Sequence, residues 1–376
     1  MTNRPEAAGR PEPTSPPPLT YRDAGVDLEA AERAVGRIAR EAAPARRPEV
    51  VGGLGAFAGF FRWGADGDRL LAATCDGVGT KLAVALEWEA RGLGGDALEG
   101  IGRDLVAMNV NDLWVHGAEP LFFLDYVATA RLDPDRVARL VRGMAAACRE
   151  AGCALLGGET AEVPGLLPPG GLELAGFAVG QVAADRLVDG RRVEPGDAIL
   201  GLPSSGPHSN GFSLIRRVVA QAGARWDDPL PGAGRTLGEA ALVPTRLYGK
   251  AVRRLLAEFD VRAMAHVTGG GLPGNLPRTL PEGCGAVLAP GRWPVPPLFR
   301  WIQQAGPVAW DEMARVFNLG IGFTVVVPAP QAPAAARAAA EALGEEVYII
   351  GRVVAGPRSV RFDPPLGTNR PQGGCP

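Results

Sequence analysis

Residues 70–86, Leu-Leu-Ala-Ala-Thr-Cys-Asp-Gly-Val-Gly-Thr-Lys-Leu-Ala-Val-Ala-Leu, join two apolar runs through a polar turn. The first run predicts a short buried strand over 70–74, and the second predicts a helix that begins near 82. At such a junction, backbone N–H groups and the helix dipole favour an anion, and glycine lets the backbone come close to a ligand. Carboxylate and hydroxyl oxygens bind Mg²⁺, and an ammonium group offsets phosphate charge. The turn therefore predicts a nucleotide-phosphate site made by Asp76, Gly77, Gly79, Thr80 and Lys81, with a structural salt bridge as the alternative for Lys81.

This turn is not the common P-loop, because Gly-x-x-x-x-Gly-Lys-Ser/Thr does not occur in the sequence. The chain has 376 residues, which predicts two domains. Its 46% hydrophobic and 21% charged residues are typical of a soluble globular protein. The net charge of −2 gives no basic field for nucleic acid, and no apolar run reaches the length of a membrane span.

The 5 cysteines are widely spaced without a Cys-x-x-Cys pair, which predicts reduced thiols and a cytoplasmic protein. The proline-rich N-terminus lacks the apolar segment of a signal peptide. Residues 1–19 and 363–376 read as disordered tails. A turn-rich stretch at 188–197 places the boundary near 185, between an N-terminal domain at 20–185 and a C-terminal domain at 186–362.

Between the tails, strand-like and helix-like stretches alternate, as they do in α/β and α+β domains. Asp133 as N-cap, Pro134 in the first turn and Gly152 as the stop delimit one helix. The other expected helices are 100–116, 212–222, 245–259, 297–305 and 331–343. The expected strands are 121–128, 153–156, 172–182, 198–202, 261–267, 284–289, 321–327 and 346–353.

Three acids could share one magnesium ion. Asp112 lies near the C-terminal end of helix 100–116, where a carboxylate opposes the helix dipole unless a cation is near. Glu159 follows a glycine pair in Gly157-Gly158-Glu159-Thr160, directly after an expected strand. Together with Asp76, these residues predict a Mg²⁺ site. The simpler alternatives are a solvated helix-end acid at Asp112 and a plain turn at 157–160; Asp104 on the same helix has a weaker case.

The chain has 3 histidines. His116 ends a helix and is expected to cap its carbonyl groups. His208 lies in the hydrogen-bonding loop Ser204-Ser205-Gly206-Pro207-His208-Ser209-Asn210-Gly211, and His266 precedes Val267-Thr268-Gly269-Gly270-Gly271. Both loops suit a phosphate or ribose, and both histidines suit acid–base or phosphate contact, with a core histidine as the alternative.

In this order along the chain, the motifs resemble the aminoimidazole ribonucleotide synthetase (phosphoribosylformylglycinamidine cyclo-ligase) family. The resemblance runs from about Tyr21 to Val354. It rests on Tyr-Arg-Asp-Ala-Gly-Val-Asp at 21–27, Asp-Gly-Val-Gly-Thr-Lys at 76–81 and Asp-Leu-Val-Ala-Met-Asn-Val-Asn-Asp at 104–112. It continues with Gly-Gly-Glu-Thr-Ala-Glu at 157–162, Ser-Ser-Gly-Pro-His-Ser-Asn-Gly at 204–211, Pro-Thr-Arg at 244–246 and His-Val-Thr-Gly-Gly-Gly at 266–271.

The resemblance implies an ATP-dependent and Mg²⁺-dependent cyclisation of formylglycinamidine ribonucleotide in purine biosynthesis, through phosphorylation of the formyl oxygen. It implies two α/β domains, with N-terminal sheets that form a β-barrel across a homodimer. The implied catalytic residues are Lys81, His208 and His266. The implied nucleotide and metal residues are Asp76, Gly77, Gly79, Thr80, Asp112, Gly157, Gly158, Glu159 and Thr160. The implied substrate residues are Ser205, Gly206, Ser209, Asn210, Thr268, Gly269 and Gly270.

Other ATP-using members of the superfamily are the first alternative. Selenophosphate synthetase requires a reactive cysteine or selenocysteine in the N-terminal glycine-rich stretch, but residues 51–60 contain no cysteine. The hydrogenase maturation dehydratase ends in cysteine, whereas Pro376 follows Cys375 here. Thiamine monophosphate kinase is a further alternative. A catalytically inactive scaffold with this fold is the last, and the intact set of Asp, Glu, His and Lys argues against it.

Overall fold

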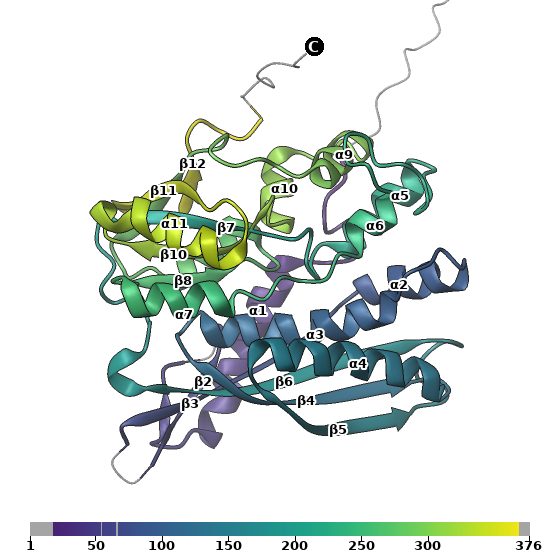
Figure 1. Ribbon diagram of the computed structural model, residues 1–376, viewed down its shortest axis with the longest axis horizontal. Coiled ribbons are helices and arrows are strands. Elements are labelled where there is room, and N and C mark those ends of the chain that lie inside the picture. The colour runs from purple at the N-terminus through teal and green to yellow at the C-terminus, as the bar shows by residue number, and fades with distance from the viewer. Residues whose placement is uncertain (1–17, 54, 65–66, 368–376) are drawn as a thin grey trace, which may run out of the picture.

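The computed structural model describes residues 18–53, 55–64 and 67–367 (Figure 1). Two six-stranded mixed sheets organise this part of the chain. The first sheet lies in the lower half of Figure 1 and the second in the upper half, with helices between and around them. The prediction of a mixed α/β fold is confirmed, and the boundary predicted near 185 falls between the last strand of the first sheet and the first strand of the second.

The N-terminal sheet has the strand order β1-β2-β3-β6-β4-β5. Its neighbours run antiparallel except β4 and β5, which are parallel. The parallel pair needs a crossover, and the helix α4 supplies it. The strands are β1 (Val50–Val51), β2 (Gly59–Trp63), β3 (Arg69–Gly77), β4 (Glu119–Thr129), β5 (Ala154–Glu162) and β6 (Leu172–Ala183).

The helices α2 (Lys81–Ala90), α3 (Ala97–Trp114) and α4 (Pro134–Ala151) lie on the side of this sheet that faces the second domain (Figure 1). Asp133 caps α4 through the N–H groups of Asp135 and Arg136, and Gly152 ends it at φ 81°. A Cβ atom at Gly102 would lie 2.0 Å from a backbone oxygen of α4, and one at Gly143 would lie 1.9 Å from a backbone oxygen of α3. Glycine at both positions therefore permits the close crossing of α3 and α4.

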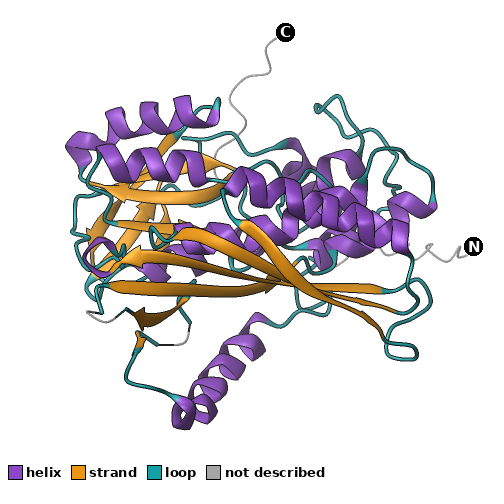
Figure 2. Ribbon diagram, turned by 60° about the horizontal axis from the view of Figure 1, so that its bottom comes forward, coloured by secondary structure: helices purple, strands orange, loops and turns teal. Residues whose placement is uncertain are grey.

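The opposite face of the N-terminal sheet has no covering helix in the view of Figure 2, and several of its apolar side chains are exposed. Tyr126 is 36% exposed, Phe177 40% and Leu156 64%. Helix α1 (Leu28–Ala42) projects from the body of the molecule in the same view, and its Val35 and Ile38 are 45% and 56% exposed. Exposed apolar groups gathered in this way are typical of a contact surface.

The C-terminal sheet has the order β12-β9-β11-β7-β10-β8, antiparallel except for the β12–β9 pair. Its strands are β7 (Ala198–Pro203), β8 (Ala263–His266), β9 (Cys284–Leu288), β10 (Ile321–Val327), β11 (Tyr348–Ala355) and β12 (Val360–Phe362). Its helices are α5 (Phe212–Gln221), α6 (Leu237–Ala241), α7 (Gly249–Glu258), α8 (Gly271–Asn275), α9 (Pro297–Ala305), α10 (Trp310–Val316) and α11 (Ala332–Leu343). Short 3₁₀ turns are η1 (Ala43–Ala45), η2 (Ala184–Arg186), η3 (Leu276–Thr279) and η4 (Ala329–Gln331).

One apolar core joins the two domains. It runs from Leu105 and Val110 on α3 to Tyr248 and Leu255 beside α7, and on to Phe323 on β10. All five side chains are fully buried. The interface between the domains is therefore packed like a protein interior.

Two expectations about local structure are wrong. Gly157-Gly158-Glu159-Thr160 lies inside β5 and is not a loop, because all of these residues pair in register with β4. Asp76 and Gly77 likewise belong to β3, paired with β6, instead of following a strand. The predicted tails lie mostly outside the described residues. Of the parts that the structure describes, Leu19 is buried and the Asp363 N–H donates to the Leu288 carbonyl at 2.8 Å.

No helix in the described ranges has both the length and the apolar character needed to cross a membrane.

Candidate active site between the domains

A cavity of about 280 Å³ lies between the two domains. The N-termini of two helices, α2 and α5, open onto it, and neither has a side-chain cap. Thr80 at the start of α2 and Ser213 in the first turn of α5 meet across the domain boundary, with their hydroxyl oxygens 3.1 Å apart. Two uncapped helix N-termini with adjacent hydroxyl groups suit an anion. The lining residues are Tyr21, Val26, Asp76, Gly77, Gly79, Thr80, Met108, Ser209, Asn210, Gly211, Phe212 and Ser213.

Asp76 lies at the C-terminal end of β3, on the wall of this cavity. Burial, and after it the negative charge of Asp112, raise the pKa of Asp76 to about 6. The N–H of Gly77 donates to the carboxylate at 2.7 Å and acts in the opposite direction. The two carboxylates therefore repel each other, and a cation between them would stabilise both in their charged form.

Asp112 is bonded to His266 across the domain boundary, with Oδ1 2.9 Å from Nδ1. His266 is fully buried at the end of β8. Asn111 lies 3.4 Å from the other ring nitrogen and donates to the Arg246 carbonyl at 2.8 Å. The carboxylate orients the imidazole, an arrangement suited to a histidine that donates to or accepts from a ligand.

His208 is fully buried and adopts φ 58°, in the left-handed region that few residues other than glycine occupy. Neither of its ring nitrogens has a hydrogen-bond partner among the described residues. Its ring centroid lies 6.1 Å from that of His266 and 6.2 Å from that of Tyr248. Burial, and secondarily His266, hold the pKa of His208 well below its ordinary value, so the imidazole is neutral at neutral pH.

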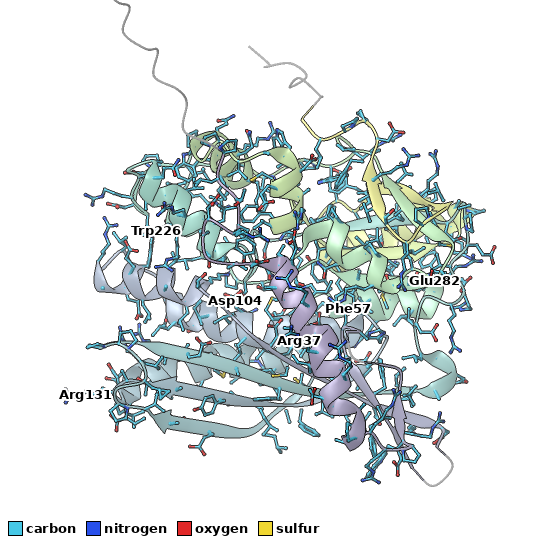
Figure 3. All side chains as sticks on the ribbon, turned by 180° about the vertical axis from the view of Figure 1, so that it is seen from behind. Arg37, Phe57, Asp104, Arg131, Trp226 and Glu282 are labelled. Carbon is cyan, nitrogen blue, oxygen red and sulfur yellow. The ribbon has the colours of Figure 1, made fainter. Side chains whose placement is uncertain are left out.

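Lys81 is not on the cavity wall. Its side chain and that of Asp104 are 0% exposed, and Nζ lies 2.8 Å from Oδ2 and 2.9 Å from Oδ1 of that aspartate. Nζ also donates to the Val243 carbonyl at 2.8 Å. Asp104 Oδ1 accepts from the Thr245 N–H at 2.7 Å and from its hydroxyl at 2.5 Å. The expected phosphate clamp is thus enclosed in an ionic cluster that links the domains, and Asp104 is labelled at this junction in Figure 3.

Glu159 is apart from the other two acids. It is exposed on β5 and pairs in register with Tyr126, whose side chain is on the uncovered sheet face. Strands β6 and β4 lie between β3 and β5, so about 14 Å of sheet separates it from the Asp76 strand. Among the described residues, no group of three or more His, Cys, Asp or Glu side chains is arranged to hold a metal. The structure therefore brings Asp76 and Asp112 together but leaves Gly157, Gly158, Glu159 and Thr160 at the sheet edge.

The residues predicted for substrate contact come from two adjoining loops. Asn210 Oδ1 accepts from the Gly269 N–H at 2.9 Å, which ties the His208 loop to the His266 loop. Asn210 Nδ2 is buried with no partner in the described part of the chain, so it can donate to a ligand. The hydroxyl groups of two other predicted residues already have protein partners: Ser205 donates to the Pro244 carbonyl at 2.6 Å, and Ser209 lies 3.5 Å from the Thr245 hydroxyl. Gly270 adopts φ 98°, a backbone conformation that favours glycine. Gly206 accepts from Asn318 at 2.8 Å, and Thr268 donates to Asn275 at 3.3 Å.

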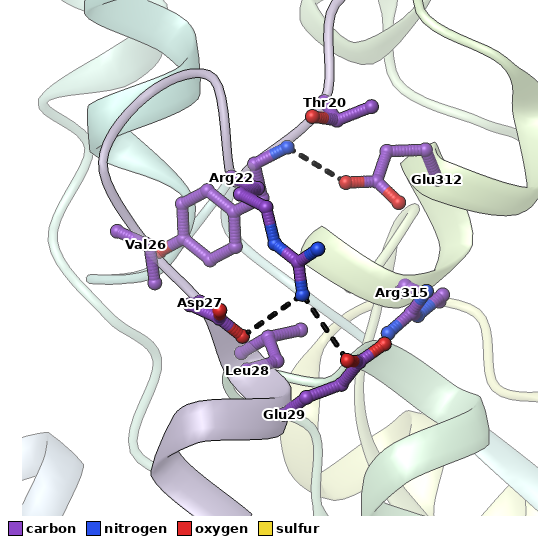
Figure 4. Close-up of a pocket in the computed structure, with 9 residues that line it drawn as sticks. Thr20, Arg22, Val26, Asp27, Leu28, Glu29, Glu312 and Arg315 are labelled. Atoms are coloured by element: carbon purple, nitrogen blue, oxygen red, sulfur yellow. Dashed lines mark hydrogen bonds and ion pairs between the residues drawn. The ribbon is translucent and has the colours of Figure 1, made fainter.

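Sequence reasoning missed the N-terminal segment as a wall of the cleft. Tyr21 lines the cavity between the domains and also a neighbouring pocket of about 190 Å³, shown in Figure 4. Its N–H donates to Glu312 on α10 at 2.7 Å. Arg22 pairs with Asp27 at 3.2 Å and with Glu29 at 3.1 Å, which closes the turn. Nothing in the spacing of this polar segment indicates that it folds back onto the second domain.

Comparisons with known proteins agree with this architecture. The family model "AIR synthase related protein, N-terminal domain" matches residues 55–182, and the corresponding C-terminal model matches 194–363. The phosphoribosylformylglycinamidine cyclo-ligase of Anaeromyxobacter dehalogenans strain 2CP-1 is 51% identical over 343 residues, covering 90% of this chain and 96% of that protein. The enzyme of the same name from Symbiobacterium thermophilum is 51% identical over 355 residues, covering 91% and 98%.

Solved structures with lower identity share the fold. Thiamine-monophosphate kinase from Stenotrophomonas maltophilia K279a has a TM-score of 0.58 at 21% identity, over 87% of this chain and 95% of that one. The hydrogenase maturation protein HypE in complex with ATP has a TM-score of 0.55 at 23% identity, over 70% and 75%. With both domain models matched in order and half of its residues shared with full-length relatives, this chain belongs to the phosphoribosylformylglycinamidine cyclo-ligase family of AIR synthase related proteins.

Proposed function

We propose that this protein closes the imidazole ring of aminoimidazole ribonucleotide from formylglycinamidine ribonucleotide, with conversion of ATP to ADP and phosphate. The observation that carries the proposal is the cavity between the domains, with Asp76 on one wall and the Asn210 loop on the other. Relatives with half of their residues identical along nearly their whole length carry the name of this reaction.

The chemistry asks for positioning and charge, not for a protein nucleophile. The formyl oxygen attacks the γ-phosphorus of ATP, and the bond from that phosphorus to the ADP oxygen breaks. The neighbouring nitrogen then attacks the formyl carbon, and phosphate leaves with the former formyl oxygen. The protein has to align these groups and stabilise the phosphoryl charge.

Asp76 and Asp112 are our candidates for magnesium ligands. Two nearby carboxylates, one with a pKa raised partly by the other, form an oxygen donor set that a dication would stabilise. When bound, magnesium would offset the charge of the ATP phosphates. The Gly77 and Gly79 backbone and the Thr80 hydroxyl, at the N-terminus of α2, are the candidates for contact with those phosphates.

His266 and His208 are the proposed acid–base and hydrogen-bonding groups. His266 is oriented by Asp112, and His208 has both ring nitrogens unpartnered among the described residues. A buried imidazole with an open nitrogen can take a proton from the ring nitrogen as it closes or donate to a phosphate oxygen. Ser209, Asn210, Gly269 and their loop neighbours are the candidates for substrate contact.

We further propose a homodimer formed through the uncovered face of the N-terminal sheet and helix α1. Tyr126, Leu156, Phe177, Val35 and Ile38 would be buried by a second copy. In this arrangement, Glu159 and its neighbours in β5 join the nucleotide site through the dimer interface, because they are remote from Asp76 in one chain. Phe177→Glu should give monomers in sedimentation velocity, and an unchanged dimer would contradict the proposed surface.

The remaining proposals concern the setting of the enzyme. We infer a cytoplasmic protein that acts on a small-molecule substrate and has no nucleic-acid or membrane partner. The 4 described cysteines are free thiols, which suits a reducing compartment.

The decisive assay combines purified protein with formylglycinamidine ribonucleotide and Mg-ATP. The expected products are aminoimidazole ribonucleotide, ADP and phosphate in equal amounts, and EDTA should abolish their formation. Retained ATP binding without turnover would instead support the inactive scaffold. Phosphorylation of thiamine monophosphate in place of ring closure would support the kinase alternative.

A further inference from the structure

The enclosure of Lys81 leaves the proposed phosphoryl-transfer site without its expected cation. Lys81 makes three polar contacts below 3.0 Å, to both oxygens of Asp104 and to Val243, and its side chain is 0% exposed. A transferring phosphoryl group carries negative charge on its oxygens. A guanidinium in addition to a metal ion and neutral hydrogen-bond donors stabilises that charge better than the metal ion and donors alone. Another cation in the described part of the chain would have to supply this charge.

Arg278 is linked through Asn275 to the loop that follows His266. It belongs to η3 in the C-terminal domain, and its charge acts on both Asp76 and Asp112. None of the ion pairs found in the described ranges includes Arg278. Its side chain is accessible to solvent, unlike that of Lys81. The guanidinium is therefore open to a ligand, although Arg278 is not among the residues that line the cavity.

Two other arginines near the cleft, Arg246 and Arg22, are already paired. Arg246 bonds Glu345, and its side chain is 17% exposed. Arg22 is shared between Asp27 and Glu29 at the outer pocket. These arginines are neutralised by carboxylates, whereas Arg278 has only neutral partners.

Arg278 is held in place by groups from both domains. Its guanidinium carbon lies 3.7 Å from the ring centroid of Phe57, and Nε donates to the Gly55 carbonyl at 3.3 Å. Nη1 donates to Asn275 Oδ1 at 3.2 Å. The ring of Phe57 fixes the plane of the guanidinium, and Figure 3 labels this residue near the junction of the domains.

Asn275 connects the arginine to the His266 loop. This fully buried amide donates to the carbonyls of Gly271 at 2.9 Å, Gly269 at 3.2 Å and Thr268 at 3.3 Å. Its oxygen then accepts from Arg278. The same loop therefore positions His266, which bonds Asp112, and the guanidinium, whose charge acts on Asp112 and Asp76.

We propose that Arg278 is a catalytic residue of this site and that its guanidinium binds oxygens of the phosphoryl group transferred from ATP to the formyl oxygen. Phe57 and Asn275 are its positioning residues. The donor atoms left for the phosphoryl group belong to Nη2, for which no hydrogen bond occurs in the described ranges. The proposal rests on the proposed ring closure in one respect, the identity of the group that accepts the phosphoryl group. The contact between Arg278 and the γ-phosphate of ATP does not depend on it.

The test compares Arg278→Met, Arg278→Lys and Phe57→Leu with Arg300→Met as the matched control. Arg300 is likewise exposed and donates Nε to a backbone carbonyl, that of Val295 at 3.2 Å, but it lies on α9. Removal of a cation that acts on the transferred phosphoryl group should lower kcat about 10²-fold or more, with a partial recovery in the lysine variant. Phe57→Leu, which keeps the charge, should lower kcat less than about tenfold, and the control should match the unmodified protein.

A binding measurement separates phosphate contact from a structural role. Arg278→Met should bind a non-hydrolysable ATP analogue at least about tenfold more weakly, with ADP affinity changed less than about threefold, because ADP lacks the contacted group. Equal weakening for both nucleotides, or a kcat within about threefold of the unmodified protein, would overturn the proposal. If the unmodified protein fails to close the ring, the proposed function fails, while the comparison of ADP with the ATP analogue still decides the role of Arg278.

Discussion

Replacement of Lys81 by methionine tests whether this residue serves stability or phosphate binding. Its ammonium and the Asp104 carboxylate are both 0% exposed and form a close ion pair. Loss of one partner leaves a buried charge uncompensated, which costs about 3–5 kcal/mol. For a domain of 150–250 residues, each kcal/mol shifts Tm by about 2–4 °C, so Lys81→Met should lower Tm by about 10 °C.

The double variant Lys81→Met, Asp104→Asn removes both buried charges at once. The asparagine oxygen still accepts from Thr245, which bonds Asp104 at 2.5 and 2.7 Å, but neither charge remains. We expect the double variant to recover at least about 2 kcal/mol relative to the sum of the single costs. The measurements are urea unfolding and calorimetry, with exposed Lys250→Met as control. A stable Lys81→Met protein whose kcat falls 10²-fold, with no recovery in the double variant, would refute the structural role and restore the phosphate clamp.

Three further predictions follow from the site and the packing. The pKa of Asp76, about 6 in the folded chain against 3.8 for the ordinary group, makes the folded state bind the proton more tightly, so stability falls as pH rises from about 4 to 6. Asp76→Asn should therefore raise the free energy of unfolding at pH 7 without metal by up to about 3 kcal/mol and lose this advantage near pH 4, which Tm against pH would check. Asp112→Asn and His266→Ala should each lower kcat about 10²-fold, and the rate of Asp112→Asn should depend more strongly on the Mg²⁺ concentration. Steady-state rates at varied Mg²⁺ measure both effects, and unchanged rates would reject both roles. Gly102→Ala should lower the free energy of unfolding by about 3 kcal/mol or more, because its Cβ would lie 2.0 Å from a backbone oxygen. Gly36→Ala on α1, where a Cβ would meet nothing within 4 Å, should raise it by up to about 1 kcal/mol. Urea unfolding measures both changes.

The sequence predicted those parts of the fold that depend on local patterns. Helix α4 begins after Asp133 and ends before Gly152 as expected, because capping and left-handed termination are short-range effects. Gly157-Gly158-Glu159-Thr160 was misread as a loop, since its pairing with β4 is set by residues more than thirty positions away. Helix α1 was missed although Asp27 caps it as Asp133 caps α4; its apolar Val35 and Ile38 are exposed and belong to no core cluster of the described residues.

The candidate site was predictable in its components but not in its contacts. Asp112 was expected near a cation, and the structure supplies His266 from the other domain, 154 positions away in sequence. Lys81 and Asp104 stood in separate motifs, and only the packing of α2 against α3 shows that they neutralise each other. Arg278 carried no sequence signal, since a single arginine after a proline is an ordinary surface residue until the fold stacks it on Phe57 and bonds it to Asn275.

The shared apolar core restricts how far the two domains can move apart during the catalytic cycle. Leu105 on α3 and Phe323 on β10 belong to one cluster, so swinging the domains apart would expose surface that is closed in both. Opening by a wide hinge would therefore cost much of the stability of the protein. The N-terminal segment that contains Tyr21 has a smaller attachment, made by the bond from the Tyr21 N–H to Glu312 and by the packing of Leu19 and Tyr21 against the C-terminal helices. The ion pairs of Arg22 lie within the segment. Nucleotide binding and product release are thus expected to follow local movement of this segment at a fixed domain geometry.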